Sequence, residues 1–288
     1  METFFQLLAN GIAFGSIYAM VAVGLTIVFG ILEVVNFAQG EFYMLAAYVT
    51  FLVYISQIPY PIAIVIAIGL MIITGLVVER FAIRPLIGRA WQLPILSTLG
   101  ISIIMQNGAI VIWTPNPRTI IIDVANINVN IFGIVLVLQK LLIILFALAL
   151  FIGLHLFIQK TKTGKAMRAV SQNKEACRII GIDVPRISAI TFAMGAGLSG
   201  FGGALVAPVM AIHPVMGILL VLKCFAAVIM GGFGNIKGTI YAAFILAIVE
   251  SFAVAYLSLQ YKDIFAFLVM IIILLFKPAG LFGRKVGI

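Results

Sequence analysis

The chain has 288 residues, of which 64% are hydrophobic and only 9% are charged, and its formal net charge is +9. A water-soluble domain with this composition would expose too much apolar surface, so the soluble classes of protein are excluded. The excess of lysine and arginine does not indicate a nucleic-acid partner, because these residues lie in short stretches between apolar runs and not on one soluble face.

Apolar runs recur along the whole sequence, and many approach the length of about 20 residues that crosses a bilayer. We predict an all-α bundle of eight or nine membrane spans in a single domain, without a convincing internal repeat. The first run is too long for a signal peptide and lacks a basic region before it, so we expect it to be retained. The predicted spans are residues 4–29, 41–56, 62–78, 93–113, 135–158, 188–210, 218–233, 239–257 and 264–276.

Two of these runs, 41–56 and 218–233, are short, and either could be a half-crossing or re-entrant segment instead of a full span. Lysine and arginine concentrate in one alternate set of connections, whereas the other set holds only Arg118 and Lys262. The positive-inside rule then places the N-terminus outside and the C-terminus in the cytoplasm. Residues 114–134 fall outside, and their β-branched residues predict an extended external loop or a short hairpin.

A polar stretch, NFAQGEFY at residues 36–43, separates the first two apolar runs and carries no lysine or arginine. One interpretation is a solvated turn in which Glu41 begins a helix. The other is a helix break that lines the inner gate of a passage, where Asn36 and Gln39 offer hydrogen bonds. We favour the break.

The longest polar stretch is residues 159–187, with seven lysine and arginine residues. From Lys165 to Ile180, small and apolar residues recur three or four positions apart, which predicts one amphipathic helix that ends at Gly181. The residues alone leave two interpretations open. The helix lies among lipid headgroups, or it is seated in a groove of a soluble partner protein.

Lys223 and Glu250 lie inside predicted spans. At 1.5 Å per residue they are about 8 and 10 Å from the outer ends of those spans, so antiparallel neighbours would bring them level. We predict a structural ion pair, because charges inside a membrane usually pair or line a water-filled path. The alternatives are that Lys223 snorkels to the surface alone and that Glu250 faces the passage.

Several blocks resemble the permease subunits of ABC importers. EACRIIG, at residues 175–181, resembles the E-A-A-x-x-x-G signature of their coupling loop, with cysteine in place of the second alanine. Residues 24–51, 222–252 and 260–286 resemble signature blocks of the branched-chain amino acid permeases, in particular their LivH-type subunits. The resemblance covers nearly the whole chain, and Gln39 stands where that family usually has histidine.

This resemblance implies a transport subunit of a bacterial inner membrane that imports branched-chain or other small neutral amino acids. Its implied partners are a second, related permease subunit, two cytoplasmic ATP-binding subunits and a periplasmic or other extracytoplasmic solute-binding protein, besides membrane lipid. The implied ATPase-coupling residues are Gly164, Arg168, Ala169, Asn173, Glu175, Ala176 and Gly181. The candidate residues of the translocation path or gate are Asn36, Gln39, Glu41 and Glu250.

Other functions stay open at this point. An ion-coupled secondary transporter would use Glu250 as its deep acid, an ABC permease of the same family could carry urea or short amides, and a structural or signalling subunit needs no passage. GGFGNIKGT, at residues 231–239, lacks the spacing of a phosphate-binding loop. His155 and His213 lack partners at metal-ligand spacing, so we expect neither ATP hydrolysis on this chain nor a cofactor or metal.

Overall fold

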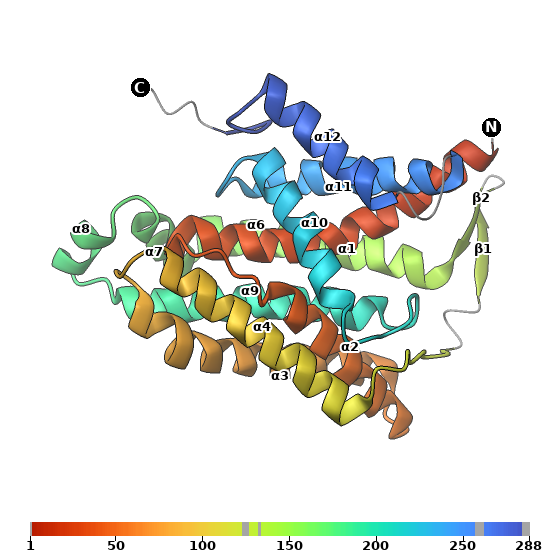
Figure 1. The fold of residues 1–288 in the computed structure, drawn as a ribbon, viewed down its shortest axis with the longest axis horizontal. Helices are drawn as coiled ribbons and strands as arrows, with labels where there is room; N and C mark the ends of the chain where they lie inside the picture. Colours follow the sequence, from red (N-terminus) through yellow and green to blue (C-terminus); the bar gives the residue numbers. More distant parts are fainter. Residues whose placement is uncertain (1, 123–126, 132–133, 257–261, 284–288) are drawn as a thin grey trace.

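The computed structural model describes residues 2–122, 127–131, 134–256 and 262–283. Its long helices run roughly along one axis of the molecule (Figure 1). The elements are α1 (Glu2–Leu32), α2 (Gln39–Ile55), α3 (Tyr60–Val78), a π-helical turn (Glu79–Ile83), a 3-10 turn (Arg84–Leu86), α4 (Gln92–Trp113), β1 (Asn128–Ile131), β2 (Ile134–Val137), α6 (Leu138–Lys160), α7 (Lys162–Val170), α8 (Lys174–Ile179), α9 (Val184–Val206), α10 (Met216–Gly231), α11 (Ile236–Tyr256) and α12 (Lys262–Phe276).

The prediction of an all-α polytopic membrane protein is confirmed, and each of the predicted apolar runs falls on a helix. Within the described residues, α1, α3, α4, α6, α9 and α11 are long and apolar enough to cross a bilayer. The helices α2, α10 and α12 are shorter, with 17, 16 and 15 residues. Length alone therefore separates two classes of helix in the bundle.

The hairpin predicted as one alternative for the external loop is present, but it takes residues from the following run. β1 and β2 pair antiparallel, with Ile131 opposite Ile134. Because residues 134–137 form a strand, α6 begins at Leu138 and not at residue 135 as predicted. The side chain of Asp183 caps α9 by accepting a hydrogen bond from the Arg186 amide, so this helix begins earlier than predicted.

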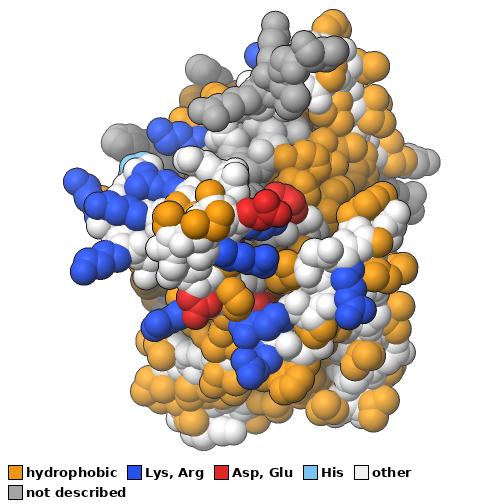
Figure 2. Space-filling view, turned by 90° about the vertical axis from the view of Figure 1, so that its left-hand side faces the viewer, with side chains coloured by type: hydrophobic (Ala, Val, Ile, Leu, Met, Phe, Trp, Pro, Cys, Tyr) orange, Lys and Arg blue, Asp and Glu red, His pale blue; other side chains and the backbone are white. Residues whose placement is uncertain are grey.

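The molecule has two chemically different ends. α7 and α8 lie at one end, which we call the basic end, and the β-hairpin and the start of α1 lie at the other, the hairpin end (Figure 1). Lysine and arginine side chains gather on the basic end, with few acidic side chains among them (Figure 2). Arg84, in the connection between α3 and α4, donates to the Pro185 carbonyl oxygen and so belongs to the same end.

The short helices α2 and α10 both begin inside the bundle and not at one of its ends. The Gln39 side chain bonds to the Gly195 carbonyl oxygen, and Gly195 lies about 16 Å along α9 from its first residue. Gly40 in turn meets Gly217, in the first turn of α10. This meeting of first turns supports the half-crossing interpretation of both short runs.

The packing relates the two halves of the chain by an approximate two-fold correspondence that the sequence does not reveal. α1 packs along α11 and α9 packs along α3, while α2 crosses α9 as α10 crosses α1. α1 and α9 run in opposite directions and touch where Gly24 meets Gly195, because a Cβ atom on Gly24 would lie 2.9 Å from the Gly195 oxygen. Such an inverted arrangement is common in transport proteins.

We expect Gly40→Ala to destabilise the protein by about 2–3 kcal/mol, a typical cost of overpacking. A Cβ atom on Gly40 would lie 2.1 Å from the Gly217 carbonyl oxygen, and this backbone atom cannot move aside as a side chain can. The matched control is Gly153→Ala in α6, where a Cβ atom meets nothing within 4 Å. Thermal unfolding of both purified variants measures the difference, and equal melting temperatures would show that the contact is not tight.

Candidate functional site

A buried polar cluster lies where the chain returns into the bundle after α1. Glu33 adopts a positive φ of 61°, which ends α1 and turns the chain inward. Gln39 Nε2 donates to the Gly195 carbonyl oxygen at 2.8 Å and to Ser199 Oγ at 2.7 Å, both on α9. Asn36 Nδ2 donates to Gln39 Oε1 at 3.0 Å. The cluster thus fixes the start of α2 against the middle of α9.

This geometry decides between the two interpretations of residues 36–43. Asn36 is 1% exposed, and Gln39 and Glu41 are 0% exposed. The solvation in the first interpretation is therefore wrong, although Glu41 stands in the first turn of α2 as that interpretation expected. The chain has the break of the second interpretation, and its place at a gate stays a prediction. The polar side chains satisfy the backbone and each other, as interrupted helices inside a membrane require.

The Glu41 carboxylate, two residues beyond Gln39 along α2, has one hydrogen-bonded oxygen and one without a partner within the described residues. Ser102 Oγ, on α4, donates to Oε1 at 3.0 Å. Oε2 has no hydrogen-bond partner within the part of the chain that the structure describes. A Cβ atom on Gly217 would lie 3.1 Å from Oε2, so this oxygen faces the first turn of α10. A helix N-terminus carries partial positive charge, which favours a carboxylate at this place.

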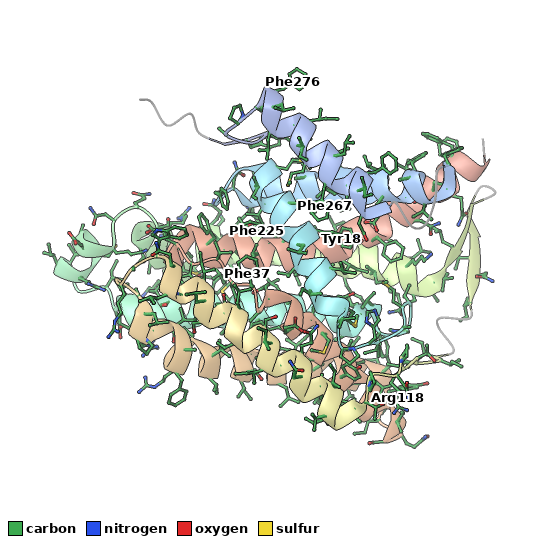
Figure 3. The ribbon with its side chains drawn as sticks, in the orientation of Figure 1. Tyr18, Phe37, Arg118, Phe225, Phe267 and Phe276 are labelled. Carbon is green, nitrogen blue, oxygen red and sulfur yellow. The ribbon has the colours of Figure 1, made fainter. Side chains whose placement is uncertain are left out.

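A second cluster joins four helices through charged groups. Lys223 Nζ on α10 lies 2.7 Å from Glu250 Oε1 on α11 and 2.6 Å from Asp263 Oδ1 on α12. The Tyr18 hydroxyl on α1 donates to Glu250 Oε2 at 2.9 Å. Figure 3 shows Tyr18 where α10 crosses α1. The structure thus brings together the two residues of the predicted ion pair, and the side chain of Lys223, 7% exposed, does not reach the surface alone.

Sequence reasoning missed Tyr18 and Asp263. Tyr18 stands in a long apolar run, where an aromatic residue normally indicates packing. The sequence therefore does not predict a polar contact for its hydroxyl group. Asp263 immediately precedes the run 264–276, and a charged residue at the edge of an apolar run indicates a connection and not the membrane interior. A signal was present, because an acidic residue in the first turn is favourable for α12.

The predicted single amphipathic helix over residues 165–180 is wrong, because two short helices take its place. α7 ends at Val170, and Asn173 begins α8 by accepting a hydrogen bond from the Ala176 amide at 2.9 Å. Asn173 has extended backbone angles, which interrupts the helix. The predicted stop at Gly181 is present, because that residue has a φ of +84° and the Ile182 amide bonds back to the Cys177 oxygen.

The interruption between α7 and α8 changes which side chains of this segment are buried. Met167, Val170 and Cys177 are buried in a cluster with residues of α1 and α6, as helical spacing predicted. Ile180 belonged to the same predicted stripe but is 73% exposed, and its neighbour Ile179 is 86% exposed. The tip of α8, which we define as Ala176, Ile179 and Ile180, therefore presents apolar side chains outward.

The other predicted coupling residues lie in α7 and in the first turn of α8, in different environments. A Cβ atom on Gly164 would lie 2.4 Å from the Phe157 oxygen, so this glycine lets α7 fold tightly back on α6. Arg168 donates to Gln159, and Ala169 is partly buried on the same helix. Glu175 is exposed in the first turn of α8. α7 is thus anchored to the bundle, while α8 projects from it.

Comparisons with known proteins agree along nearly the whole chain. Residues 7–274 match the family model described as the permease component of branched-chain amino acid transport systems. The chain is 32% identical to the high-affinity branched-chain amino acid transport system permease protein BraD of Pseudomonas aeruginosa, covering 98% of this chain and 96% of that protein. It is 33% identical to LivH of Escherichia coli with the same coverage, and 31% identical to a probable LivH of Methanocaldococcus jannaschii, covering 96% and 92%.

One solved structure, PsaBC from Streptococcus pneumoniae in complex with Fab, matches with a TM-score of 0.52. The match covers 93% of this chain and 91% of that chain, at 10% sequence identity. At this identity the likeness concerns the fold alone.

Proposed function

Because the chain belongs to the family of permease components of branched-chain amino acid transport systems, we propose that it forms part of the membrane passage of an ATP-driven importer for these amino acids. The observation that carries the proposal is the pair of short helices whose first turns meet inside the bundle beside Glu41, whose Oε2 has no hydrogen-bond partner within the described residues. Helices interrupted in the membrane interior are how transport proteins place polar groups in the path of a solute.

The position of Glu41 suits a solute that carries both charges. An amino acid bears an ammonium group, which a carboxylate such as Glu41 attracts, and a carboxylate, which the amide groups at the start of α10 attract. In the present conformation Glu41 is fully buried. The solute would therefore meet it only when the subunit opens during the transport cycle. Asn36 and Gln39 hold α2 in place behind it.

Glu41→Gln is expected to reduce leucine uptake by the assembled transporter at least about tenfold, because it removes the charge and keeps the shape of the side chain. Glu41→Asp keeps the charge and should retain more activity than Glu41→Gln. Initial uptake rates in vesicles measure both, and size-exclusion profiles check that the complex is intact. If Glu41→Gln is as active as Glu41→Asp, the proposed role of the Glu41 charge in the solute path is wrong.

The segment of α7 and α8 supplies the second part of the proposal. We place the basic end in the cytoplasm, in accordance with the concentration of lysine and arginine there, and the N-terminus on the opposite side. The exposed tip of α8 would then be seated in a groove of an ATP-binding subunit. Because α7 is packed on α1 and α6, a displacement of α8 would be passed to those two helices.

The decisive experiment is uptake by the reconstituted complex. The chain is co-expressed with a second permease subunit, two ATP-binding subunits and a solute-binding protein, and is then placed in sealed vesicles. We expect uptake of leucine, isoleucine and valine only with ATP on the basic-end side and the binding protein on the other. Uptake driven by a sodium or proton gradient without ATP would instead favour the secondary transporter. Uptake of urea but not of amino acids would show that the solute is urea.

A further inference from the structure

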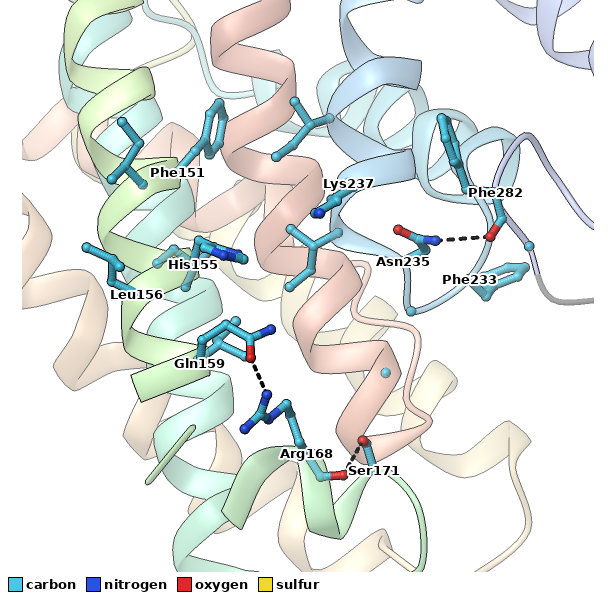
Figure 4. A pocket seen from close by; sticks show the side chains of 18 of the residues that line it. Phe151, His155, Leu156, Gln159, Arg168, Ser171, Phe233, Asn235, Lys237 and Phe282 are labelled. Atoms are coloured by element: carbon cyan, nitrogen blue, oxygen red, sulfur yellow. Dashed lines mark hydrogen bonds between the residues drawn. The ribbon is translucent and has the colours of Figure 1, made fainter. Parts of the chain in front are cut away.

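The basic end contains a cavity of about 940 Å³ that neither the solute path nor the tip of α8 uses. It lies between the end of α6, the side of α7 and the turn from α10 to α11, with Gly30 of α1 also in its lining (Figure 4). Phe282, near the end of the described chain, closes one side. Its volume is in the range of cavities that hold small ligands.

The lining of this cavity is one-sided in charge. Its charged residues are Arg168 and Lys237, and no acidic residue lies among the described residues that line it. Polar side chains that accompany them, such as Gln159 and Asn235, can bond to an anion. Lys237 is exposed, and its ammonium group forms no ion pair within the described residues. The cavity is therefore suited to an anionic ligand and offers nothing to bind an ammonium group.

The remainder of the lining is apolar and continuous with the outer surface of a membrane-spanning helix. Ile152 and Leu156 of α6 line the cavity and are 53% and 49% exposed. Leu145 and Leu148 extend the same stripe along α6, and each is more than half exposed. A ligand in the cavity thus meets cations at the end of the molecule and hydrocarbon along α6.

We propose that this cavity binds one anionic phospholipid, with its phosphate between Arg168 and Lys237 and an acyl chain along the apolar stripe of α6. Basic pockets between membrane helices on the cytoplasmic side suit such headgroups. A zwitterionic amino acid would lack a carboxylate partner here, which distinguishes this cavity from the surroundings of Glu41. The lipid would connect α7 to the bilayer, because Arg168 belongs to α7.

The test measures lipid binding by native mass spectrometry of the purified protein, titrated with phosphatidylglycerol or with phosphatidylcholine of the same acyl chains. Neither solute nor ATP is needed, so the result is independent of the proposed transport function. We expect tighter binding of phosphatidylglycerol, weakened about fivefold by each of Lys237→Gln and Arg168→Gln. The matched controls are Lys162→Gln and Arg178→Gln, exposed cations of the same end that do not line the cavity.

A second variant tests the role of the apolar lining of the cavity. Ile240→Trp fills the cavity from the α11 side without changing any charge, and it should weaken the binding of both lipids. Equal affinity for the two lipids, or an equal loss in the control variants, would overturn the proposal. Displacement of phosphatidylglycerol by excess inorganic phosphate with no effect of Ile240→Trp would show an anion site without lipid specificity, and would overturn it as well.

Discussion

Lys223→Met is expected to lower the free energy of unfolding by about 3–5 kcal/mol, the usual cost of removing one partner from a buried ion pair. The ammonium group of Lys223 neutralises two carboxylates on two other helices, Glu250 and Asp263. Without it, the Glu250 carboxylate, 10% exposed, remains poorly solvated and is repelled by the partly exposed carboxylate of Asp263. We expect the variant to melt at a much lower temperature and to lose uptake.

A further variant shows whether Lys223→Met loses stability through the missing charge or through a packing defect. The triple variant Lys223→Met, Glu250→Gln, Asp263→Asn removes all three charges and should recover most of the lost stability, because replacing a whole buried ionic group is often nearly neutral. Glu33→Gln is the surface control, since its partner Lys174 lies 3.3 Å away and Glu33 is 75% exposed. That control should have little effect. If the triple variant is no more stable than Lys223→Met, the charges are not the reason for the loss.

The double variant Ile179→Asp, Ile180→Asp is expected to reduce the stimulation of ATP hydrolysis by solute-loaded binding protein about 100-fold or more. Burial of one isoleucine contributes about 1.5–3 kcal/mol, so two lost contacts alone account for a factor of this size, and the new charges would add a desolvation cost. Both side chains are largely exposed in the isolated chain, so its own folding should be unaffected.

Two measurements and two further variants make this second prediction specific. Stimulated ATP hydrolysis by the reconstituted complex is the main readout, and co-purification of the ATP-binding subunit shows whether docking itself fails. Ala176→Trp, on the same exposed tip, should act in the same direction because it adds bulk to a seated surface. Lys162→Asp changes charge at an exposed position of α7 and serves as the control. Full stimulation in the double variant would contradict the docking role of α8.

The sequence predicted those features that depend on composition and local spacing. Apolar length located the helices, and helical rise placed Lys223 and Glu250 at one depth before any contact was known. Gly181 ended α8 as expected, because only its own backbone conformation was needed. In each case the deciding information lay within a few residues of the feature.

Other features depended on partners far along the chain or on competing local signals. Gln39 is buried because Gly195 and Ser199 satisfy its amide, and nothing in residues 36–43 indicates those partners. The break before α8 had a local signal, since asparagine at residue 173 is a good helix start, but the regular apolar spacing on both sides concealed it. The correspondence between the two halves lies in packing contacts, and the sequence shows no convincing internal repeat.

The charged cluster also has a consequence for how the protein is made. α10 carries Lys223 and α12 begins beside Asp263, and both helices are short for stable insertion into a bilayer on their own. During synthesis, α10 leaves the ribosome before α12, so Lys223 lacks Asp263 as a partner until α12 has been made. We therefore expect the last three helices to insert in concert, and a chain that ends before residue 263 to be less stable in the membrane than the full chain.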